Sequence, residues 1–407
     1  MNAPQIAQHL EPSYRILQVF NKYLQFGGEE KSVKRIRSQL SLQHTLTSCT
    51  FDSENWINDH APTRVSQVLR MFYNPSAIDQ LDASIQRSRP DAILLHNLYP
   101  VGSPGIYRTA LTHSVPIIQY IHNFRPFSVG GTLWAKGRLC EKSLHGNYWD
   151  EVRLGAWQNS VLKSAIFASV LKFLHTTDWL RAVKGWIAIS KFMRDKFIEA
   201  GVDPATVHIL QHAWDIQTAA NEIGRDDGQY VFLGRLVEEK GIGVLLETWE
   251  LLEAELGDRA PELWIGGDGP LSNSVTRAAE KSDKVRYLGF VDGKNKRDIL
   301  TNCRAMLAPS IWWEPLGLVT YEAYDYKKPM FAASSGGLSE TVDHGRTGYL
   351  HDAGNARQLA EQIAAYEMLP ASRRQELGRE GRRWLERNAN PDAWQDNFRQ
   401  ILDAVLG

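Results

Sequence analysis

The chain has 407 residues, of which 43% are hydrophobic and 23% are charged, and its formal net charge is −1 at pH 7. This length exceeds what one hydrophobic core usually supports, so we expect two domains in an ordinary globular protein. Its three cysteines (Cys49, Cys140 and Cys303) are too few and too scattered for a disulfide framework or a metal cage, which favours a reducing, cytoplasmic compartment. Residues 1–20 lack the pattern of a signal peptide, and no run approaches the roughly 18 apolar residues of a membrane span.

The near-zero net charge conceals an imbalance between the two halves. Residues 1–212 contain 23 Lys+Arg against 16 Asp+Glu, whereas residues 213–407 contain 23 against 31. A surplus of this kind predicts that the N-terminal half meets something anionic. Random drift of surface charge between two domains is an equally good explanation, and the sequence leaves both open.

Strands and helices alternate along the first half of the chain. YRILQVF is an expected strand, followed by a helix from about Glu29, and two further apolar strands flank a helical stretch near 103–113. GWIAIS is another strand, leading into the helix KFMRDKFIEAG. These strands cover residues 14–20, 91–97, 116–123 and 185–190. Strands separated by helical segments predict a parallel sheet with crossover helices.

The second half repeats the same order of strand and helix. The expected strands cover residues 229–235, 262–267, 284–290, 304–310 and 328–334. Two such runs predict an α/β fold with two doubly wound parallel-sheet domains, which change over near residues 210–217. We expect domains at 1–212 and 213–388, and a final amphipathic helix within 389–407 that packs back on the first domain.

Ligands of open α/β sheets bind beyond the carboxyl ends of the strands, so four turns there are candidate sites. FGGEEKS (26–32) offers two glycines before a helix, and GRLVEEKG (234–241) offers two cations suited to a diphosphate. GGDGPL (266–271) lacks the third glycine of a dinucleotide fingerprint, which argues against nicotinamide binding. Each of these turns could also be an ordinary connection.

The fourth turn, SIWWEPLGLVTYEAY (310–324), places Glu314 and Glu322 in an otherwise apolar stretch. A carboxylate there is costly unless a partner is present. Carboxylates accept hydrogen bonds from hydroxyls, and the amides of a helix start bind anions. Two carboxylates that flank a helix start therefore predict a ligand with an anionic middle and a polyol at each end, as in a nucleoside diphosphate sugar.

Together these motifs resemble the retaining glycosyltransferases of family 4, which have the GT-B fold with two Rossmann-like domains facing each other across a cleft. The resemblance rests on E-x7-E at Glu314 and Glu322, on the three glycine-containing turns above, and on GGLSETV followed by GRTGYL (336–350). LLHNLYP and YIHNFRP resemble a subgroup with two His-Asn motifs. The motifs occur in the family's order over nearly the whole chain.

The resemblance implies a role for each candidate residue. Arg235 and Lys240 would hold the donor diphosphate and stabilise charge on the leaving nucleotide. Glu322 would bind the ribose, and Glu314 would bind the transferred sugar. His122 would lie beside the donor sugar, although without the other motifs it would read as a core histidine.

Two further groups of residues follow from the resemblance. The remaining donor-binding candidates are backbone positions, namely Gly27, Gly28, Gly317, Leu318 and Val319. His96 and Asn97 are acceptor-side candidates, for which a structural role is equally good. The resemblance implies a reaction without a metal, a cofactor or a protein nucleophile, and the sequence has no Asp-x-Asp motif between a strand and a turn.

The predicted function is therefore transfer of a sugar from a UDP- or GDP-linked donor to a glycan or lipid-linked acceptor, with no nucleic acid involved. Tryptophans and basic residues mingle in residues 133–184, which fits contact with the anionic inner face of the cytoplasmic membrane, or simply helices that cover a sheet. His212-Ala213 replaces the Asn-Gly of many relatives at the hinge, and Cys140 lacks a cysteine partner. A sugar-nucleotide epimerase or hydrolase and a catalytically silent nucleotide-sugar-binding module remain the alternatives.

Overall fold

A computed structural model describes residues 13–24, 27–59, 61–218 and 225–407. Two six-stranded sheets dominate it, and their paired strands run parallel. The expected α/β class with two doubly wound sheets is thus confirmed. Of the residues considered for a signal peptide, 1–12 lie outside the described residues, as does Phe26 of the first glycine turn.

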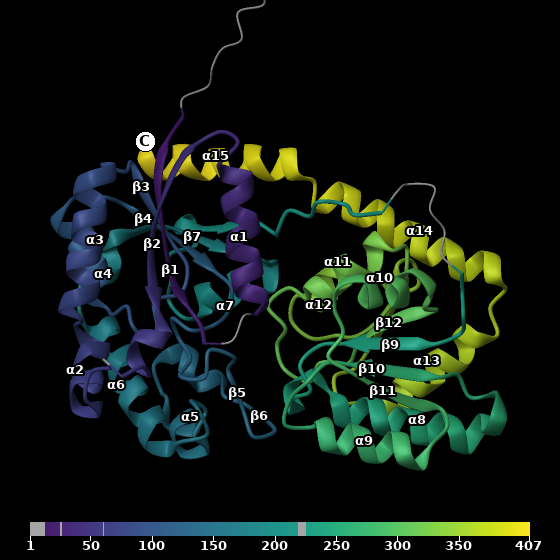
Figure 1. The fold of residues 1–407 in the computed structure, drawn as a ribbon. Helices are drawn as coiled ribbons and strands as arrows, with labels where there is room; N and C mark the ends of the chain where they lie inside the picture. Colours follow the sequence, from purple (N-terminus) through teal and green to yellow (C-terminus); the bar gives the residue numbers. More distant parts are fainter. Residues whose placement is uncertain (1–12, 25–26, 60, 219–224) are drawn as a thin grey trace, which may run out of the picture. The chain divides into compact units, whose positions relative to one another are not determined.

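The first sheet has the strand order β2-β1-β3-β4-β7-β8. Apolar residues fill its centre, since all four residues of β3 and all five of β4 are buried. Figure 1 shows α1 on one side of these strands and α3 and α4 on the other. The elements of this part are β1 (Arg15–Lys22), α1 (Gly28–Leu40), β2 (Thr45–Asp52), α2 (Arg64–Phe72), α3 (Pro75–Ser88), β3 (Ala92–Leu95), α4 (Gly105–Thr112), β4 (Ile117–Ile121), β7 (Val183–Ala188), α7 (Lys191–Glu199) and β8 (Val207–Ile209).

The second sheet has the strand order β11-β10-β9-β12-β13-β14. The order reverses at β9 and β12, so their carboxyl ends form the point where ligands of such sheets bind. In Figure 1, α8, α9 and α13 lie on one side of this sheet and α10 to α12 on the other. Its elements are β9 (Tyr230–Leu233), α8 (Ile242–Leu256), β10 (Leu263–Gly266), α9 (Ser272–Lys281), β11 (Val285–Gly289), α10 (Gly293–Asn302), β12 (Ala305–Ala308), α11 (Leu318–Asp325), β13 (Met330–Ala333), α12 (Leu338–Thr341), β14 (Gly348–His351), α13 (Ala356–Glu367), α14 (Ala371–Asn388) and α15 (Pro391–Leu406).

The core of the second sheet explains why its strands are short and apolar. Tyr230, Trp249 and Phe331 are buried and lie in edge-to-face contact around the centre of the sheet. Parallel strands covered by helices on both faces carry apolar residues at nearly every position. The strand positions expected from such runs are confirmed, whereas β2, β8 and β14 were not expected.

The chain divides into two compact units. The first comprises residues 1–121, 172–187 and 397–407, and the second comprises residues 122–171 and 188–396. The expected domain boundaries remain a prediction. Gly27, Gly28, His96 and Asn97 belong to the first unit, and the other candidate site residues, including Glu314 and Glu322, belong to the second.

Residues 133–184, the stretch in which tryptophans and basic residues mingle, include two small strands and two α-helices. These are β5 (Trp134–Ala135), β6 (Arg138–Leu139), α5 (Trp149–Leu154) and α6 (Val161–Thr176). Trp149 and Leu162 are strongly exposed, whereas Phe167 and Leu171 are buried. Cys140 is a buried free cysteine. No helix in the part of the chain that the structure describes is long and apolar enough to cross a membrane.

Candidate functional site

The partner of Glu314 is Lys240. The Lys240 ammonium lies 2.8 Å from Oε1 and 2.7 Å from Oε2 of Glu314, and the side chains are only 22% and 13% exposed. Ser310 Oγ and Trp312 Nε1 also donate to the carboxylate, at 3.1 and 3.0 Å. The largely buried carboxylate thus has three hydrogen-bond donors from two loops, which offset the cost of its burial.

Backbone contacts between the loops 234–241 and 309–314 bring Lys240 to Glu314. Gly241 has φ 77°, and a Cβ on it would lie 1.9 Å from the carbonyl oxygen of Pro309. Only glycine permits this approach together with this conformation. The amide of Ile311 donates to the carbonyl of Glu239 at 3.0 Å, so hydrogen bonding fixes the same loop pair a second time.

The GGDGPL turn (266–271) packs against the loop 234–241. A Cβ on Gly267 would lie 1.8 Å from the carbonyl oxygen of Gly234, and one on Gly269 would lie 2.5 Å from that of Leu236. The amide of Leu236 donates to the carbonyl of Asp268 at 2.9 Å. These glycines therefore permit close contact with the chain's own backbone, which gives the turn a structural reason for its glycines.

Helix α11 begins directly after the Glu314 loop. Its N-cap is Gly317, with φ 88°, and Glu322 lies on its second turn. No backbone acceptor among the described residues takes the amides of Gly317, Leu318 and Val319. Free amides at a helix start carry partial positive charge and suit a phosphate. Glu322 forms an ion pair with Lys296 at 2.7 Å.

A second support of the Glu314 loop comes from the loop that follows β13. Gly336 has φ 58°, and a Cβ there would lie 2.3 Å from the carbonyl oxygen of Glu314. The amide of Gly337 donates to the same carbonyl at 2.7 Å. Glycines of the GGLSETV motif thus allow the two loops to lie in contact.

The start of helix α7 fastens the loop from another side. Ser190 caps this helix by accepting from the amide of Met193, and its hydroxyl donates to the carbonyl of Pro315 at 2.7 Å. Glu340 accepts from the amides of Lys191 and Phe192 at 2.8 and 2.6 Å. Three segments remote in sequence, namely loop 234–241, Gly336 with Gly337, and Ser190, therefore hold the loop that carries Glu314.

The far end of helix α11 is anchored by Asp325, which is fully buried. Its carboxylate accepts from Trp214 Nε1 and the amides of Gln217 and Thr218, at 2.9 to 3.2 Å. Arg382 of helix α14 pairs with the same carboxylate at 3.3 Å. This cluster connects segment 214–218 to the helix that carries Glu322.

His122 stacks on His212, with ring centroids 5.5 Å apart and an interplanar angle of 11°. Desolvation by burial lowers the pKa of His122 to about 3. Its imidazole is therefore neutral at physiological pH and can exchange hydrogen bonds without adding a positive charge. Arg235, in contrast, is 67% exposed and lies 3.7 Å from the carboxylate of Glu239.

Two glycosyltransferase families match the chain. Residues 215–384 match "Glycosyl transferases group 1", and residues 26–218 match "Glycosyltransferase Family 4". The structure of Anabaena Alr3699/HepE in complex with UDP superposes with a TM-score of 0.65 and 15% identity, over 95% of this chain and 99% of that one. Together the two matches span residues 26–384, and the chain shares the GT-B fold of this neighbour.

Curated relatives align with this chain over only part of their own length. Spore coat protein SA of Bacillus subtilis is 32% identical over 255 residues, which are 58% of this chain and 64% of the relative. Phosphatidyl-myo-inositol mannosyltransferase of Mycobacterium leprae is 27% identical over 208 residues, or 50% of this chain and 54% of the relative. The chain thus spans less than two thirds of either relative.

The remaining candidate site residues lie in the first unit. Gly28 begins helix α1 behind Gly27, and a Cβ on Gly28 would meet no atom within 4 Å, so the space above it is open. His96 is buried beside Gln18, whose Nε2 lies 3.0 Å from His96 Nε2. Asn97 bonds the backbone of Tyr99 through both ends of its amide, which is a structural role in the turn.

The sequence did not single out four residues that contact candidate site residues or their loops, namely Lys296, His212, Ser190 and Glu340. The signal for Lys296 was weak, because several lysines precede β12 and the helical spacing does not single one out. Ser190 stood in the quoted strand GWIAIS, directly before a helix, where serine is a favoured cap. Among the described residues, no group of three or more His, Cys, Asp or Glu gathers in metal-binding geometry.

Proposed function

We propose that this protein transfers a sugar, with retention of configuration, from a UDP-sugar to a glycan or lipid-linked acceptor. The observation that carries the proposal is the Glu314–Lys240 pair beside the start of helix α11, which has no side-chain cap and also bears Glu322. The two carboxylates can accept hydrogen bonds from sugar and ribose hydroxyls, and the amides between them can donate hydrogen bonds to phosphate oxygens. A UDP donor is favoured over GDP because Anabaena HepE has been solved with UDP and with UDP-glucose.

Each end of the donor has its own partners in this proposal. Glu322, oriented by Lys296, accepts from the ribose hydroxyls, and Glu314 accepts from hydroxyls of the transferred sugar. The amides of Gly317, Leu318 and Val319 bind phosphate oxygens, helped by Lys240 and by Arg235, whose long exposed side chain is free to turn toward an anion. Gly27 and Gly28 allow an anion to approach the backbone closely at the start of helix α1.

The reaction proceeds on one face of the sugar. The bond between the anomeric carbon and the phosphate oxygen breaks, and the nucleoside diphosphate leaves with the bonding pair. An acceptor hydroxyl oxygen forms the new bond to the same carbon from the same face, and its proton passes to the departing phosphate oxygen. Positive charge and amides around that oxygen stabilise the transition state. Neutral His122 offers a hydrogen bond to the sugar without opposing its developing positive charge.

Glu314 has a second function in this scheme. Because Lys240 is shared between the carboxylate and the diphosphate, donor binding redistributes its hydrogen bonds, which orients the carboxylate toward sugar hydroxyls. The step needs no metal, since the cations and amides of the protein neutralise the leaving group.

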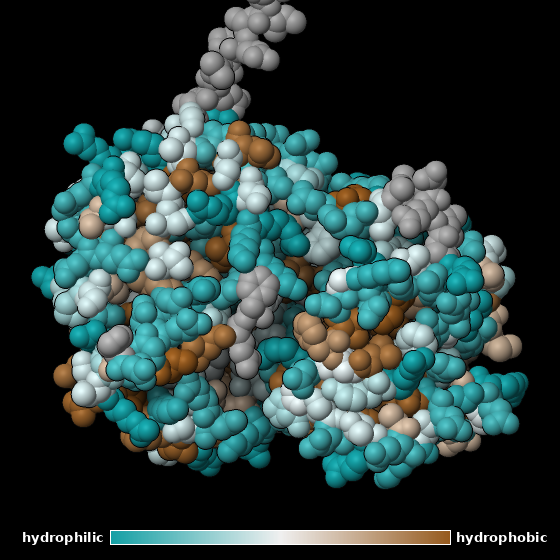
Figure 2. All heavy atoms as spheres, viewed as in Figure 1, coloured by the Kyte–Doolittle hydropathy of each residue, from teal (hydrophilic) through white to brown (hydrophobic). Residues whose placement is uncertain are grey.

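For the acceptor we propose a lipid-linked or growing glycan at an anionic membrane face. The N-terminal half carries the positive surplus, and Trp149, Val161 and Leu162 are exposed near basic side chains in sequence. The name of the Mycobacterium leprae relative, a phosphatidyl-myo-inositol mannosyltransferase, supports this class. Figure 2 shows the hydrophobic residues of the viewed face as separate patches in a hydrophilic surface, which suits reversible attachment.

Two other functions compete with this proposal. An epimerase or hydrolase would consume a nucleotide sugar without an acceptor, and a silent binding module would leave it intact. The complete set of Glu314, Lys240, Glu322 and free helix-start amides argues for turnover. A product assay distinguishes the three, because only a transferase forms a product larger than the donor sugar.

The decisive experiment is a thermal-shift scan against UDP-, GDP- and ADP-sugars, followed by product analysis with the donor that binds. A ligand at 100 times its Kd stabilises the folded state by about 2.7 kcal/mol, which is readily measured. Stabilisation by UDP-sugars and transfer to a lipid-linked saccharide are expected. If no nucleotide sugar shifts the transition, the proposed donor site is wrong.

Membrane attachment is tested separately by co-sedimentation with anionic and neutral vesicles at low and high salt. Each well-placed basic residue contributes about 1 kcal/mol near an anionic surface, and salt screens this attraction. Sedimentation with anionic vesicles at low salt only is expected. Protein that stays in the supernatant in every condition would remove the membrane from the proposal.

A further inference from the structure

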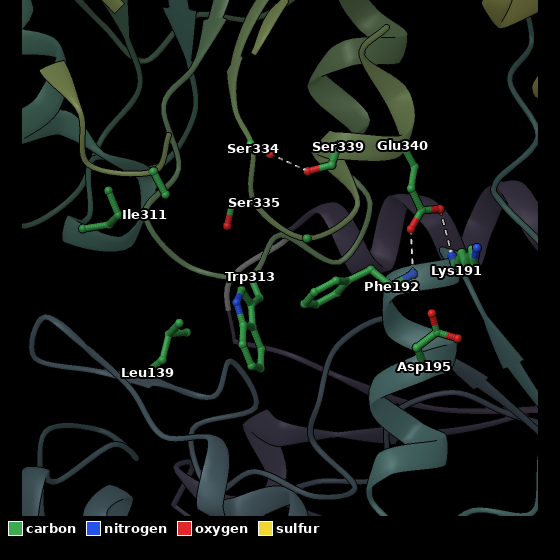
Figure 3. A pocket seen from close by; sticks show the side chains of 12 residues that line it. Leu139, Lys191, Phe192, Asp195, Ile311, Trp313, Ser334, Ser335, Ser339 and Glu340 are labelled. Carbon is green, nitrogen blue, oxygen red and sulfur yellow. Dashed lines mark hydrogen bonds between the residues drawn. The ribbon is translucent and has the colours of Figure 1, made fainter. Parts of the chain in front are cut away.

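A cavity of about 390 Å³ opens beside the Glu314 loop, within the second unit. It lies beyond the carboxyl ends of β12, β13 and β14, next to the start of helix α7 (Figure 3). The residues around it are Leu139, Lys191, Phe192, Asp195, Ile311, Trp313, Ser334, Ser335, Gly336, Ser339, Glu340 and Ala353. Its volume falls in the range of small-ligand pockets, roughly 300 to 1,000 Å³.

This cavity is separate from the groups assigned to the donor. Trp313 and Ile311 line it, whereas the neighbouring Glu314 directs its carboxylate to Lys240. The peptide of Glu314 lies in contact with Gly336, which lines the cavity. A ligand in the cavity would therefore lie next to the loop that is proposed to hold the transferred sugar.

An immobilised aromatic side chain projects into the cavity. Trp313 makes an edge-to-face contact with Phe192 at 5.3 Å, and the ammonium of Lys196 lies 4.2 Å from its ring centroid. These contacts fix the indole before any ligand arrives, which reduces the entropy lost on binding. The electron-rich face of an indole attracts the C–H groups of a sugar ring.

Polar groups line the other side of the cavity. Ser334 Oγ and Ser339 Oγ lie 3.3 Å apart and are both exposed, so they can exchange their mutual bond for ligand hydroxyls. The carboxylate of Glu340, already held by two amides of helix α7, keeps lone pairs for further donors. Figure 3 shows Trp313 across the cavity from the Ser339 and Glu340 side.

The charges of the lining disfavour an anionic ligand. Lys191 is opposed by Asp195 and Glu340, which leaves one net negative charge. An aromatic wall, serine hydroxyls and carboxylates that accept hydrogen bonds match a neutral sugar, which has an apolar C–H face and a rim of hydroxyls. They do not match a phosphate or a carboxylated ligand, which would require an excess of cations.

We propose that this cavity binds one neutral sugar residue of the acceptor glycan. The assignment to the acceptor rests on the proposed transferase function, whereas binding of a neutral sugar rests on the cavity alone. Trp313 stacks on the sugar ring, and Ser334, Ser339 and Glu340 accept or donate hydrogen bonds at its rim. The site holds the acceptor chain on the side of the Glu314 loop that faces away from Lys240.

The experiment is saturation-transfer NMR of methyl α-glucopyranoside, methyl α-galactopyranoside and methyl N-acetylglucosaminide with the full-length protein. Ser339→Trp fills the cavity from an exposed position on helix α12, and Ser372→Trp adds the same side chain at an exposed position of helix α14 outside the cavity. We expect transfer to at least one sugar with the wild type and with Ser372→Trp, and at least tenfold weaker binding with Ser339→Trp.

UDP binding, measured on the same three proteins, separates this inference from the proposed function. Equal UDP affinity in all three is expected, because Ser339 has no part in the donor site. Absence of UDP binding by the wild type would overturn the donor proposal, while the sugar signals are still read on their own. Sugar binding that persists in Ser339→Trp, or no binding of any of the three sugars by the wild type, would refute the cavity assignment.

Discussion

The coupling between Lys240 and Glu314 can be measured without any substrate. Fully exposed ion pairs contribute about 0–1 kcal/mol, whereas removal of one partner of a buried pair costs about 3–5 kcal/mol. Both side chains here are less than one quarter exposed, and Glu314 retains its donors Ser310 and Trp312 when the lysine is lost. We therefore expect Lys240→Met to lower the free energy of unfolding by about 2 kcal/mol.

A double-mutant cycle tests this reasoning. Glu314→Gln and the double variant complete the cycle, with urea denaturation followed by tryptophan fluorescence as the assay. The double variant should be less destabilised than the sum of the singles by about 1–2 kcal/mol, because it leaves no isolated charge at the loop. Arg235→Met is the matched control, since this exposed pair is screened by solvent and should change stability by less than about 0.5 kcal/mol. Single effects that add within about 0.5 kcal/mol would refute a functional unit of Lys240 and Glu314.

Three further predictions concern other parts of the site. Glu322→Ala should weaken UDP binding about tenfold to a hundredfold, the value of lost charge-assisted hydrogen bonds, while Glu314→Ala changes it less than about threefold; calorimetry with UDP decides, and equal losses would reverse the assignment of the two ends. Asp325→Ala should lower the free energy of unfolding by about 3–5 kcal/mol, because it removes the buried carboxylate that accepts from three donors and pairs with Arg382, and a loss below about 1 kcal/mol in urea titrations would contradict this. Because the folded-state pKa of His122 is lowered to about 3, the stability that its neutral form contributes is present above pH 6.5 and is lost as the pH falls toward 3. His122→Asn should therefore reduce the slope of the free energy of unfolding against pH in this range by up to about 1.4 kcal/mol per pH unit, measured by urea titrations at several pH values. An unchanged slope would show that His122 is not protonated on unfolding.

The sequence predicted the fold because its strands are apolar on both faces and are separated by helical patterns. Strand β2 escaped prediction because its TLTSCTFD alternates weakly and only Cys49 and Phe51 are buried, as befits an edge strand. The short β8 and β14 depend on neighbours already in place, which local composition does not reveal.

Within the candidate site, local spacing predicted that Glu314 and Glu322 flank a helix start. It did not predict their partners, Lys240 for one and Lys296 for the other. It also did not predict how Arg235 and Lys240 differ, since one is exposed and the other is held by a carboxylate, and their shared role at the diphosphate stays a prediction. Ion pairing between loops is set by the register of the sheet and by glycine contacts, and neither is visible in a single sequence.

The glycine contacts have a consequence for how this candidate site can change. Gly241, Gly267 and Gly336 bring neighbouring loops together through peptide atoms, so the spacing of the loops does not depend on the identity of the side chains above them. Substitutions at Trp313 or Ser339 alter the surface offered to a sugar while the scaffold of touching peptides stays as it is. A library that randomises those side chains and preserves the glycines would explore new saccharide specificities on one unchanged backbone, whereas a single alanine at Gly241 would remove the frame on which all of them depend.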